Sequence, residues 1–194
     1  MYTCVGLFGE LGTGSRILSL GVEAAEVTGY DCVGALVGRN TGGTIGHCYA
    51  TGTVSGQDYV GGLIGANGLS SIGYCYARVA TTGESDVGGL VGTSYTGTVT
   101  SCHATGAVTG TGDHVGGLVG RSYFGAVTSC CATGAVTGST HIGGLVGYSD
   151  SSIVTSSYAA GMVTGANNVG GLAGYFFSGR ITSCYAMGAV TGNT

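Results

Sequence analysis

Two histidines and their neighbouring carboxylates are the residues whose types and spacing come closest to a metal site. His114 and His141 occupy one position in consecutive copies of a repeat, and Asp86 and Asn168 occupy it in the copies on either side. Two imidazoles and a carboxylate could hold a transition metal. The preceding position carries assorted polar residues, as an exposed corner would: Asp31, Asp58, Ser85, Asp113, Thr140 and Asn167. We therefore predict no bound metal and no cofactor.

Catalysis by a nucleophile or by paired carboxylates has weaker support. Cys131 and His103 approach a nucleophile with its base, but no third group is placed to orient the base. Glu84, Asp86 and Asp113 could supply carboxylates for glycoside hydrolysis, yet they are placed at corners rather than in a cluster. We predict that the chain is not an enzyme.

Eight cysteines invite a disulfide framework, but their positions favour free buried thiols. Five share one repeat position, which Leu20 and Ser157 fill elsewhere: Cys48, Cys75, Cys102, Cys130 and Cys184. A position that accepts Leu, Ser and Cys is typical of a small buried site. Side chains stacked in parallel register rarely meet the dihedral angle of a disulfide. Cys4 and Cys32 share a different position in adjacent copies, where the spacing allows either a disulfide or two thiols.

Aromatic residues form two sets that could contact a ligand. The position after the shared cysteine should point outward, because side chains alternate along a strand; its tyrosines are Tyr49, Tyr76, Tyr158 and Tyr185. These rings could stabilise the contact between repeats by stacking, or could bind a sugar or a protein. The second set thickens toward the C-terminus: Tyr95, Tyr123, Phe124, Tyr148, Tyr175, Phe176 and Phe177. A gradient of exposed aromatics indicates a contact surface.

An internal repeat of about 27 residues sets all these positions. An anchor box, V-G-G-L-V-G or a variant of it, begins near residues 5, 33, 60, 87, 115, 142 and 169. A second box, V-T-S-C-Y-A-T-G-A-V-T-G in its clearest copies, follows each anchor. These runs are rich in β-branched residues and bounded by Gly, which indicates about three short strands per repeat. Stacked identical coils bury the apolar side that a single coil leaves exposed.

The sequence therefore predicts an all-β, right-handed parallel β-solenoid, or β-helix, of seven coils that forms a single domain over residues 1–194. The right-handed winding follows from the crossover rule for parallel strands. Two ladders of apolar side chains should point inward. They are Leu36, Leu63, Leu90, Leu118, Leu145 and Leu172, and Val54, Val108, Val136, Val163 and Val190.

The repeat resembles the GLUG motif, which is named for its Gly-Leu-any-Gly core, over essentially the whole chain. GLUG repeats occur in bacterial surface proteins, including haemagglutinin-like adhesins and zinc-dependent immunoglobulin-A1 peptidases. The peptidases would carry an H-E-x-x-H zinc site outside their repeats, and that motif does not occur in this sequence. The resemblance thus implies this architecture and an extracellular or cell-surface location, but not proteolysis.

Composition argues against two classes of partner. Only 7% of the residues are charged, the net charge is -4 and Lys is absent, so the chain lacks the basic stripe that nucleic acid requires. No uninterrupted apolar stretch reaches the roughly 18 residues of a membrane-spanning helix. We expect neither nucleic-acid binding nor membrane insertion.

The leading hypothesis is a structural protein that stacks head to tail with itself as a fibre subunit, or with flanking repeats as an adhesin stalk, because neither end shows a cap. The alternative is an adhesin module whose aromatic ladders bind carbohydrate or a host protein. A third alternative is ice binding by an outward threonine file: Thr28, Ser55, Thr82, Thr109, Thr137, Thr164 and Thr191. Arg78 and Met187 interrupt the second file that ice binding would need.

Overall fold

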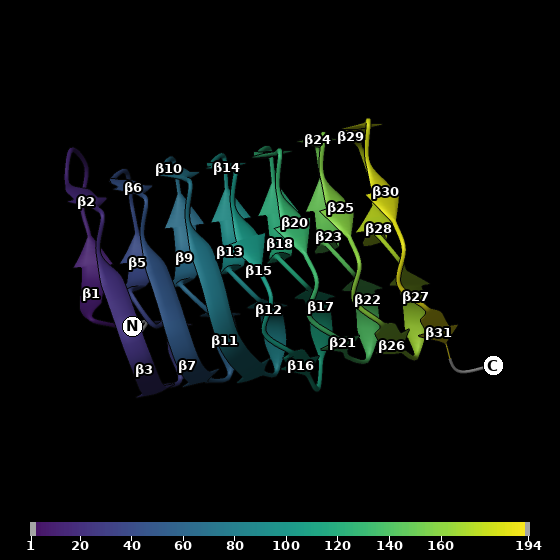
Figure 1. Ribbon diagram of the computed structural model, residues 1–194, viewed down its shortest axis with the longest axis horizontal. Helices are drawn as coiled ribbons and strands as arrows, with labels where there is room; N and C mark the ends of the chain where they lie inside the picture. Colours follow the sequence, from purple (N-terminus) through teal and green to yellow (C-terminus); the bar gives the residue numbers. More distant parts are fainter. Residues whose placement is uncertain (1–2, 193–194) are drawn as a thin grey trace.

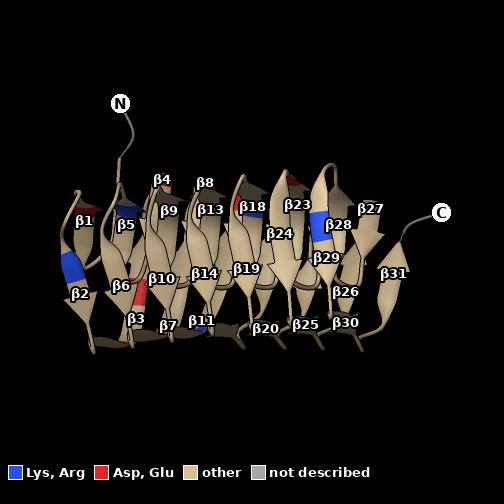
Figure 2. Cartoon of the chain, turned by 90° about the horizontal axis from the view of Figure 1, so that it is seen from above, with Lys and Arg blue, Asp and Glu red and all other residues tan. Residues whose placement is uncertain are grey.

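The computed structural model describes residues 3–192, and parallel strands wind through them as a β-solenoid of about seven coils of ~27 residues. The described residues form 31 strands and no helix, hence no helix that is long and apolar enough to cross a bilayer. Equivalent strands of successive coils lie side by side along a rod (Figure 1). Charged residues are few and scattered over this rod (Figure 2). Residues 1, 2, 193 and 194 of the predicted domain lie outside the described residues.

Each coil after the first passes through four sheets, which we name by their place relative to the anchor box; the first coil reaches the pre-anchor sheet only through an isolated bridge at Val5. The pre-anchor sheet contains β4 (Asp31–Gly34), β8 (Asp58–Gly61), β12 (Ser85–Gly88), β17 (Asp113–Gly116), β22 (Thr140–Gly143) and β27 (Asn167–Gly170). The post-anchor sheet contains β1 (Phe8–Leu11), β5 (Val37–Asn40), β9 (Ile64–Gly68), β13 (Val91–Tyr95), β18 (Val119–Tyr123), β23 (Val146–Asp150) and β28 (Ala173–Phe176).

The other two sheets complete the coil. The short-strand sheet contains β2 (Arg16–Leu18), β6 (Thr44–Gly46), β10 (Ser71–Gly73), β14 (Thr98–Thr100), β19 (Ala126–Thr128), β24 (Ser152–Thr155) and β29 (Gly179–Thr182). The 11-stranded sheet begins with the long strands β3 (Gly21–Thr28), β7 (Tyr49–Ser55) and β11 (Tyr76–Gly83). Its later strands are β15 (His103–Ala104), β16 (Val108–Gly110), β20 (Cys131–Ala132), β21 (Val136–Thr137), β25 (Tyr158–Ala159), β26 (Val163–Gly165), β30 (Tyr185–Ala186) and β31 (Val190–Gly192).

The sequence predicts about three strands per coil, whereas the coil of β8–β11 has four and the coil of β12–β16 has five. The anchor box is the main reason for the difference, because it is two strands rather than one. It runs in along the pre-anchor sheet, bends at the Gly-Leu pair and runs out along the post-anchor sheet. In the later coils the strand of the 11-stranded sheet is also interrupted, as between Ala104 and Val108.

Two glycines of the anchor box allow this bend. A Cβ on Gly116 would overlap the carbonyl oxygen of Val119 and would lie 2.7 Å from the nitrogen of Gly147. A Cβ on Gly120 would lie 2.6 Å from the carbonyl carbon of Asp86, in the neighbouring coil. The two limbs of the box therefore pack backbone against backbone, which only Gly permits.

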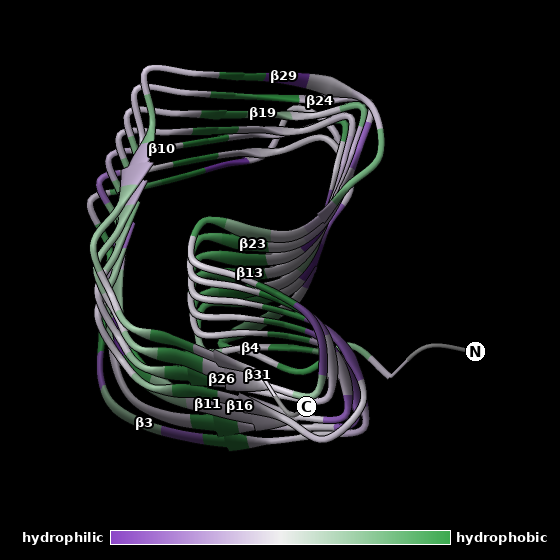
Figure 3. Cartoon of the chain, turned by 90° about the vertical axis from the view of Figure 1, so that its right-hand side faces the viewer, coloured by the Kyte–Doolittle hydropathy of each residue, from purple (hydrophilic) through white to green (hydrophobic). Residues whose placement is uncertain are grey.

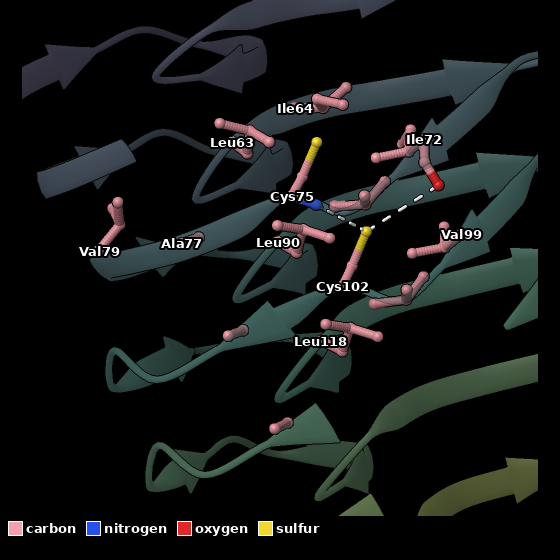
Figure 4. Close-up of a cluster of buried hydrophobic side chains, with 14 of the residues drawn as sticks. Leu63, Ile64, Ile72, Cys75, Ala77, Val79, Leu90, Val99, Cys102 and Leu118 are labelled. Carbon is pink, nitrogen blue, oxygen red and sulfur yellow. Dashed lines mark hydrogen bonds between the residues drawn. The ribbon is translucent and has the colours of Figure 1, made fainter. Parts of the chain in front are cut away.

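The leucine ladder fills the core on the inner side of this bend. Leu63, Leu90 and Leu118 are fully buried and lie near Ile72, Val99 and the buried thiols of Cys75 and Cys102 (Figure 4). The valine ladder is equally buried from Val54 to Val163, as predicted, with Thr81 in the place of Val in one coil. Seen end on, hydrophobic residues, drawn in green, lie along strands on both sides of the coil interior, including β13 and β23 on one side and β11 on the other (Figure 3).

The last coil differs from the inner ones because no further coil covers its ladder residues. Val190 is 47% exposed, whereas its neighbour Val163 in the ladder is fully buried. Ile181 of β29 is 39% exposed, whereas its register partner Val154 is buried. All the described residues of β29, β30 and β31 are exposed.

The cysteines are free thiols throughout, and the four inner members of the shared position are buried. The Sγ of Cys48 donates a hydrogen bond to the backbone oxygen of Gly46 at 3.2 Å. The Sγ of Cys102 accepts one from the backbone nitrogen of Cys75 and donates one to the backbone oxygen of Thr100. Cys4 and Cys32, the pair for which a disulfide was considered, are also free. Burial and the nearby Cys4 thiol raise the pKa of Cys32 to about 12.

Candidate functional site

A groove runs along the rod on the outer side of the anchor bend. One wall is the corner column at the residue before each anchor Val: Cys32, Tyr59, Asp86, His114, His141 and Asn168. All six residues have left-handed backbone, with φ between 48° and 61°. Left-handed φ is uncommon outside Gly, Asn and Asp, and it breaks the alternation of side chains along a strand. The corner column therefore contacts the post-anchor sheet instead of alternating in and out.

The other wall is the post-anchor column, one residue from each strand of the post-anchor sheet. Its members, paired in register from coil to coil, are Glu10, Arg39, Ala66, Thr93, Arg121, Tyr148 and Tyr175. The post-anchor column changes in residue size along the rod. Ala66 and Thr93 are small, whereas Tyr148 and Tyr175 in the later coils are large and aromatic.

Aromatic rings close the C-terminal half of the groove. His114 and His141 stack with ring centroids 5.1 Å apart, and Tyr148 and Tyr175 stack at 5.3 Å. The two stacks meet edge to face, with His141 5.6 Å from Tyr148 and 5.2 Å from Tyr175. Such edge-to-face contacts are favourable because the ring edge is positive and the ring face is negative. This half of the groove is a packed cluster.

A buried carboxylate lies at the middle of the groove. Asp86 is 2% exposed, and its Oδ1 accepts a hydrogen bond of 2.8 Å from Nδ1 of His114. Nη1 of Arg121 lies 3.2 Å from its Oδ2. A buried carboxylate requires such partners, since an unpaired buried charge is strongly destabilising. Arg121 also lies over the ring of Tyr123, 4.8 Å from the centroid, so its guanidinium is held in place from two sides.

A cavity of about 610 Å³ opens in the N-terminal half. It exists because Ala66 and Thr93 fill little of the post-anchor column, where Tyr148 and Tyr175 fill the later coils. Arg39 and Arg121 bound it along the column, and Tyr59 and Tyr95 line it from the corners. A second cavity of about 240 Å³ adjoins it at Asp86 and His114.

The two histidines considered for a metal do not converge on a point, because their rings are stacked face to face. Among residues 3–192 no group of three or more His, Cys, Asp or Glu side chains is arranged to hold a metal ion. Cys131 and His103 are register partners on the 11-stranded sheet, and both project from its outer face.

Comparison with known proteins bears on the repeat itself. The family description "The GLUG motif" matches residues 29–55 and 83–109. Each match covers one whole coil, from the glycine before the pre-anchor sheet through the 11-stranded sheet. The chain contains GLUG repeats. The bend glycines and the buried leucine of each GLUG repeat are the residues on which the coil geometry depends.

The solenoid built from these GLUG repeats resembles a solved structure. A crystal structure described as a "putative immunoglobulin A1 protease" from Bacteroides ovatus superimposes with a TM-score of 0.63 and 22% identity over 90% of this chain. The match spans 59% of the solved protein, so the chain corresponds to somewhat more than half its length. At this identity the likeness shows the fold alone. No curated protein matches the sequence.

Ring contacts join most of the second aromatic set along the GLUG coils. Tyr95 and Tyr123 pair with each other, Tyr148 and Tyr175 belong to the post-anchor column, and Phe124 and Phe177 are exposed next to it. Phe176 was predicted to belong to a contact surface, but it takes the register of the buried Ser149 and packs partly against the core. The contact surface expected from these seven residues stays a prediction; within it the ring of Tyr123 contacts Tyr95 on one side and Tyr148 on the other.

The tyrosine ladder lies on the outer face of the 11-stranded sheet, in the register predicted. Tyr49 stacks on Tyr76, and Tyr158 on Tyr185, each pair with centroids 5.0 Å apart and nearly parallel rings. Within each pair, the ring faces that are turned toward each other are covered, and the ring edges remain exposed. This geometry favours a role in coil-to-coil contact over stacking on a sugar.

Sequence reasoning missed the most distinctive part of the groove. Arg39, Tyr59 and Thr93 were not singled out, although Arg39 and Arg121 share one repeat position. The signal that could have found them is the change in residue size along that position. At this position the residues of four consecutive coils are large, small, small and large, and this pattern predicts a gap in the column between Arg39 and Arg121.

The His141 ring should make stability depend on pH. Burial, and then the nearby His114, lower the pKa of His141, while Asp113 opposes the shift, and Tyr148 and Tyr175 cover the ring. Its Nδ1 is buried without a hydrogen-bond partner. A histidine whose folded pKa is depressed contributes stability above its unfolded pKa of about 6.5 and loses it as pH falls through the folded value. We expect the melting temperature to fall between pH 7 and pH 5, and to fall less in His141→Gln.

The matched control for this prediction is His103→Gln, which changes an exposed histidine of the 11-stranded sheet. Thermal melts followed by circular dichroism at both pH values measure the difference. An equal pH dependence in His141→Gln and the unchanged chain would contradict the assignment to His141.

Proposed function

We propose that this GLUG solenoid is a structural rod at the bacterial cell surface, whose coils stack end to end as a fibre subunit or stalk segment. The observation that carries the proposal is the exposed apolar ladder of the last coil. Val190 and Ile181 are the register counterparts of fully buried residues, and within the described residues both are exposed. A further coil in the same register would bury both.

The backbone supports the same proposal. Parallel strands pair continuously from the first coil to the last in the post-anchor and short-strand sheets, so each terminal strand has one edge that could accept another strand. Strand addition at such an edge supplies main-chain hydrogen bonds and needs no new surface chemistry. Contacts that repeat head to tail without closing produce open filaments.

The surface location rests on the GLUG repeats and on the resemblance of their motif to bacterial surface proteins. The solved protein described as an immunoglobulin A1 protease is considerably longer than the region matched here. From its stacked coils we propose a supporting role for this chain.

End-to-end stacking predicts filaments. Electron microscopy of the purified chain at micromolar concentration should show unbranched filaments with an axial repeat of roughly 34 Å, from seven coils spaced by ~4.8 Å. Val190→Asp should abolish them, because the charge would be buried without a partner at each junction.

Ile153→Asp is the matched control, since Ile153 is similarly exposed, at 48%, but lies on the side of the rod in β24. It should leave the filaments intact. Melting curves of both variants establish that each remains folded. Isolated short rods from the unchanged chain, or filaments that persist in folded Val190→Asp, would overturn self-association.

A further inference from the structure

Two cysteines lie one above the other where the corner column begins. Cys4 and Cys32 immediately precede Val5 and Val33, which form an isolated parallel bridge between the first two coils. The backbone nitrogen of Val5 donates a hydrogen bond of 3.0 Å to the carbonyl oxygen of Cys32. Neighbouring parallel strands are ~4.8 Å apart. That separation falls within the range of about 4.4–6.8 Å that disulfides span between Cα atoms.

The two side chains approach each other because their backbones differ. The thiol of Cys4 lies within hydrogen-bonding reach of the thiol of Cys32. Side chains stacked in parallel register rarely meet the dihedral angle of a disulfide. Cys32, however, has left-handed backbone, with φ at 48°, whereas Cys4, which lies within the described residues, does not have a positive φ. The Cα–Cβ bonds of this pair are therefore not constrained to be parallel, and the usual obstacle to a disulfide between stacked residues does not apply.

The cysteines of the core provide an internal comparison. Cys75 and Cys102 are also stacked in adjacent coils, but neither has a positive φ, and both are completely buried. The backbone nitrogen of Cys75 donates to the Sγ of Cys102 at 3.4 Å (Figure 4). These thiols keep the parallel arrangement and are closed to any reagent in the solvent, so we expect them to remain reduced while the chain is folded.

Exposure decides which corner cysteine reacts first. Cys4 is half-buried and so can be reached from the solvent, whereas Cys32 is only 3% exposed. Burial, and then the neighbouring Cys4, raise the pKa of Cys32 to about 12, so little of its thiol is ionised at neutral pH. The thiolate is the reactive form of cysteine. An oxidant therefore meets Cys4 first, and Cys32 reacts within the protein afterwards.

A covalent bond here would fasten the part of the first coil that has the fewest backbone contacts. The first coil pairs with the second through β1 and β5, β2 and β6, and β3 and β7. In the pre-anchor sheet, by contrast, the two coils share only the isolated bridge at Val5. Segments with few backbone hydrogen bonds open more readily than the rest of a fold. A disulfide between Cys4 and Cys32 would close this corner.

From the register, the contact between the thiols and the difference in backbone, we propose that Cys4 and Cys32 are a modification site at which a small-molecule disulfide, such as oxidised glutathione, forms a disulfide bond. The thiolate of Cys4 attacks one sulfur of the oxidant and releases its first thiol. Cys32 then loses its proton and attacks the Sγ of Cys4, which releases the second thiol. The two cysteines lose two protons and two electrons, and the oxidant becomes two thiols. This reaction does not depend on the stacking of the rod ends.

Peptide mapping tests the bond directly. Trypsin cleaves after Arg16 and Arg39, so Cys4 and Cys32 are the single cysteines of peptides 1–16 and 17–39. The reduced, folded chain is treated with millimolar oxidised glutathione, alkylated in denaturant and digested. Mass spectrometry should show these two peptides linked to each other, and should show Cys75 and Cys102 alkylated.

Hydrogen exchange followed by NMR tests the fastening of the first coil. The amide of Val5 should exchange more slowly in the oxidised chain than in the reduced chain, by at least about tenfold, and dithiothreitol should restore the faster rate. Cys4→Ser should remove both the linked peptides and the slower exchange. Cys131→Ser is the matched control, because it changes another half-buried cysteine, whose register partners are His103 and Tyr158, and it should retain both.

Three results would overturn the proposal. The peptides 1–16 and 17–39 could emerge unlinked after oxidation of the folded chain. Cys4 could instead keep glutathione as a stable mixed disulfide, which would show that Cys32 cannot reach it. The linked chain could also exchange the Val5 amide as fast as the reduced chain, which would show that the bond does not fasten the coil.

Discussion

Leu118→Asp is expected to abolish the fold. Leu118 is fully buried in the middle of the leucine ladder, between Leu90 and Leu145, and its carbonyl accepts a hydrogen bond from the backbone nitrogen of Leu90 at 2.9 Å. The substitution removes a core side chain and buries a carboxylate without a partner, which together cost more than about 5 kcal/mol. That is comparable to the whole stability of many domains.

Because Leu118 lies in a central coil, its substitution is expected to unfold the whole rod. Each coil contacts only its neighbours, so a failed coil in the centre separates the coils on either side. Circular dichroism and urea unfolding at room temperature should show no cooperative transition under conditions where the unchanged chain is folded.

Leu69→Asp is the matched control, because it makes the same chemical change at a leucine that is 78% exposed. Leu69 has left-handed backbone, with φ at 50°, which Asp adopts more readily than Leu. Its stability should be unchanged or slightly higher. A soluble Leu118→Asp protein with a melting temperature close to that of Leu69→Asp would contradict the assignment of this ladder to the core.

Gly116→Ala is expected to have the second-largest effect, although it adds only a methyl group. In a strand this substitution normally stabilises a protein, because Ala restricts the unfolded chain. The Cβ that the substitution adds would overlap the carbonyl oxygen of Val119, across the bend of the anchor box. Neither atom can move without opening the bend, so we expect a loss of at least about 3 kcal/mol in the free energy of unfolding.

Gly73→Ala provides the comparison, since it lies in β10 and a Cβ there would approach no atom closer than 3.8 Å. Its stability should be unchanged or raised by up to about 1 kcal/mol. Chemical denaturation of the two variants checks the contrast. Equal effects would show that the bend tolerates a side chain and that the glycines have another role.

The period, the parallel stacking and the inward ladders could be predicted from the sequence. In a solenoid the coil length equals the repeat length, so equivalent residues lie one above another. Leu63, Leu90 and Leu118 could therefore be assigned to one buried ladder from their spacing alone. The outward tyrosine ladder could be predicted in the same way, because Tyr49 and Tyr76 follow the buried cysteines in simple strand alternation.

The number of strands and the groove could not be predicted in this way. The anchor box reads as one strand, and only the backbone contact between its two limbs shows that it bends. The corner column has left-handed backbone at Tyr59 and Cys32, residue types that do not signal it. This conformation redirects side chains that alternation would place elsewhere.

The sequence by itself determined which residues stack, because stacking follows the repeat period. Tertiary structure decided which columns face each other, and so which residues from different columns meet. Tyr59, Thr93 and Arg121 belong to different coils and two different columns, and the bend at the anchor glycines brings them to one cavity. The physical reason is that a ladder depends on spacing along one column, whereas a cavity depends on the backbone angles at the corners between columns.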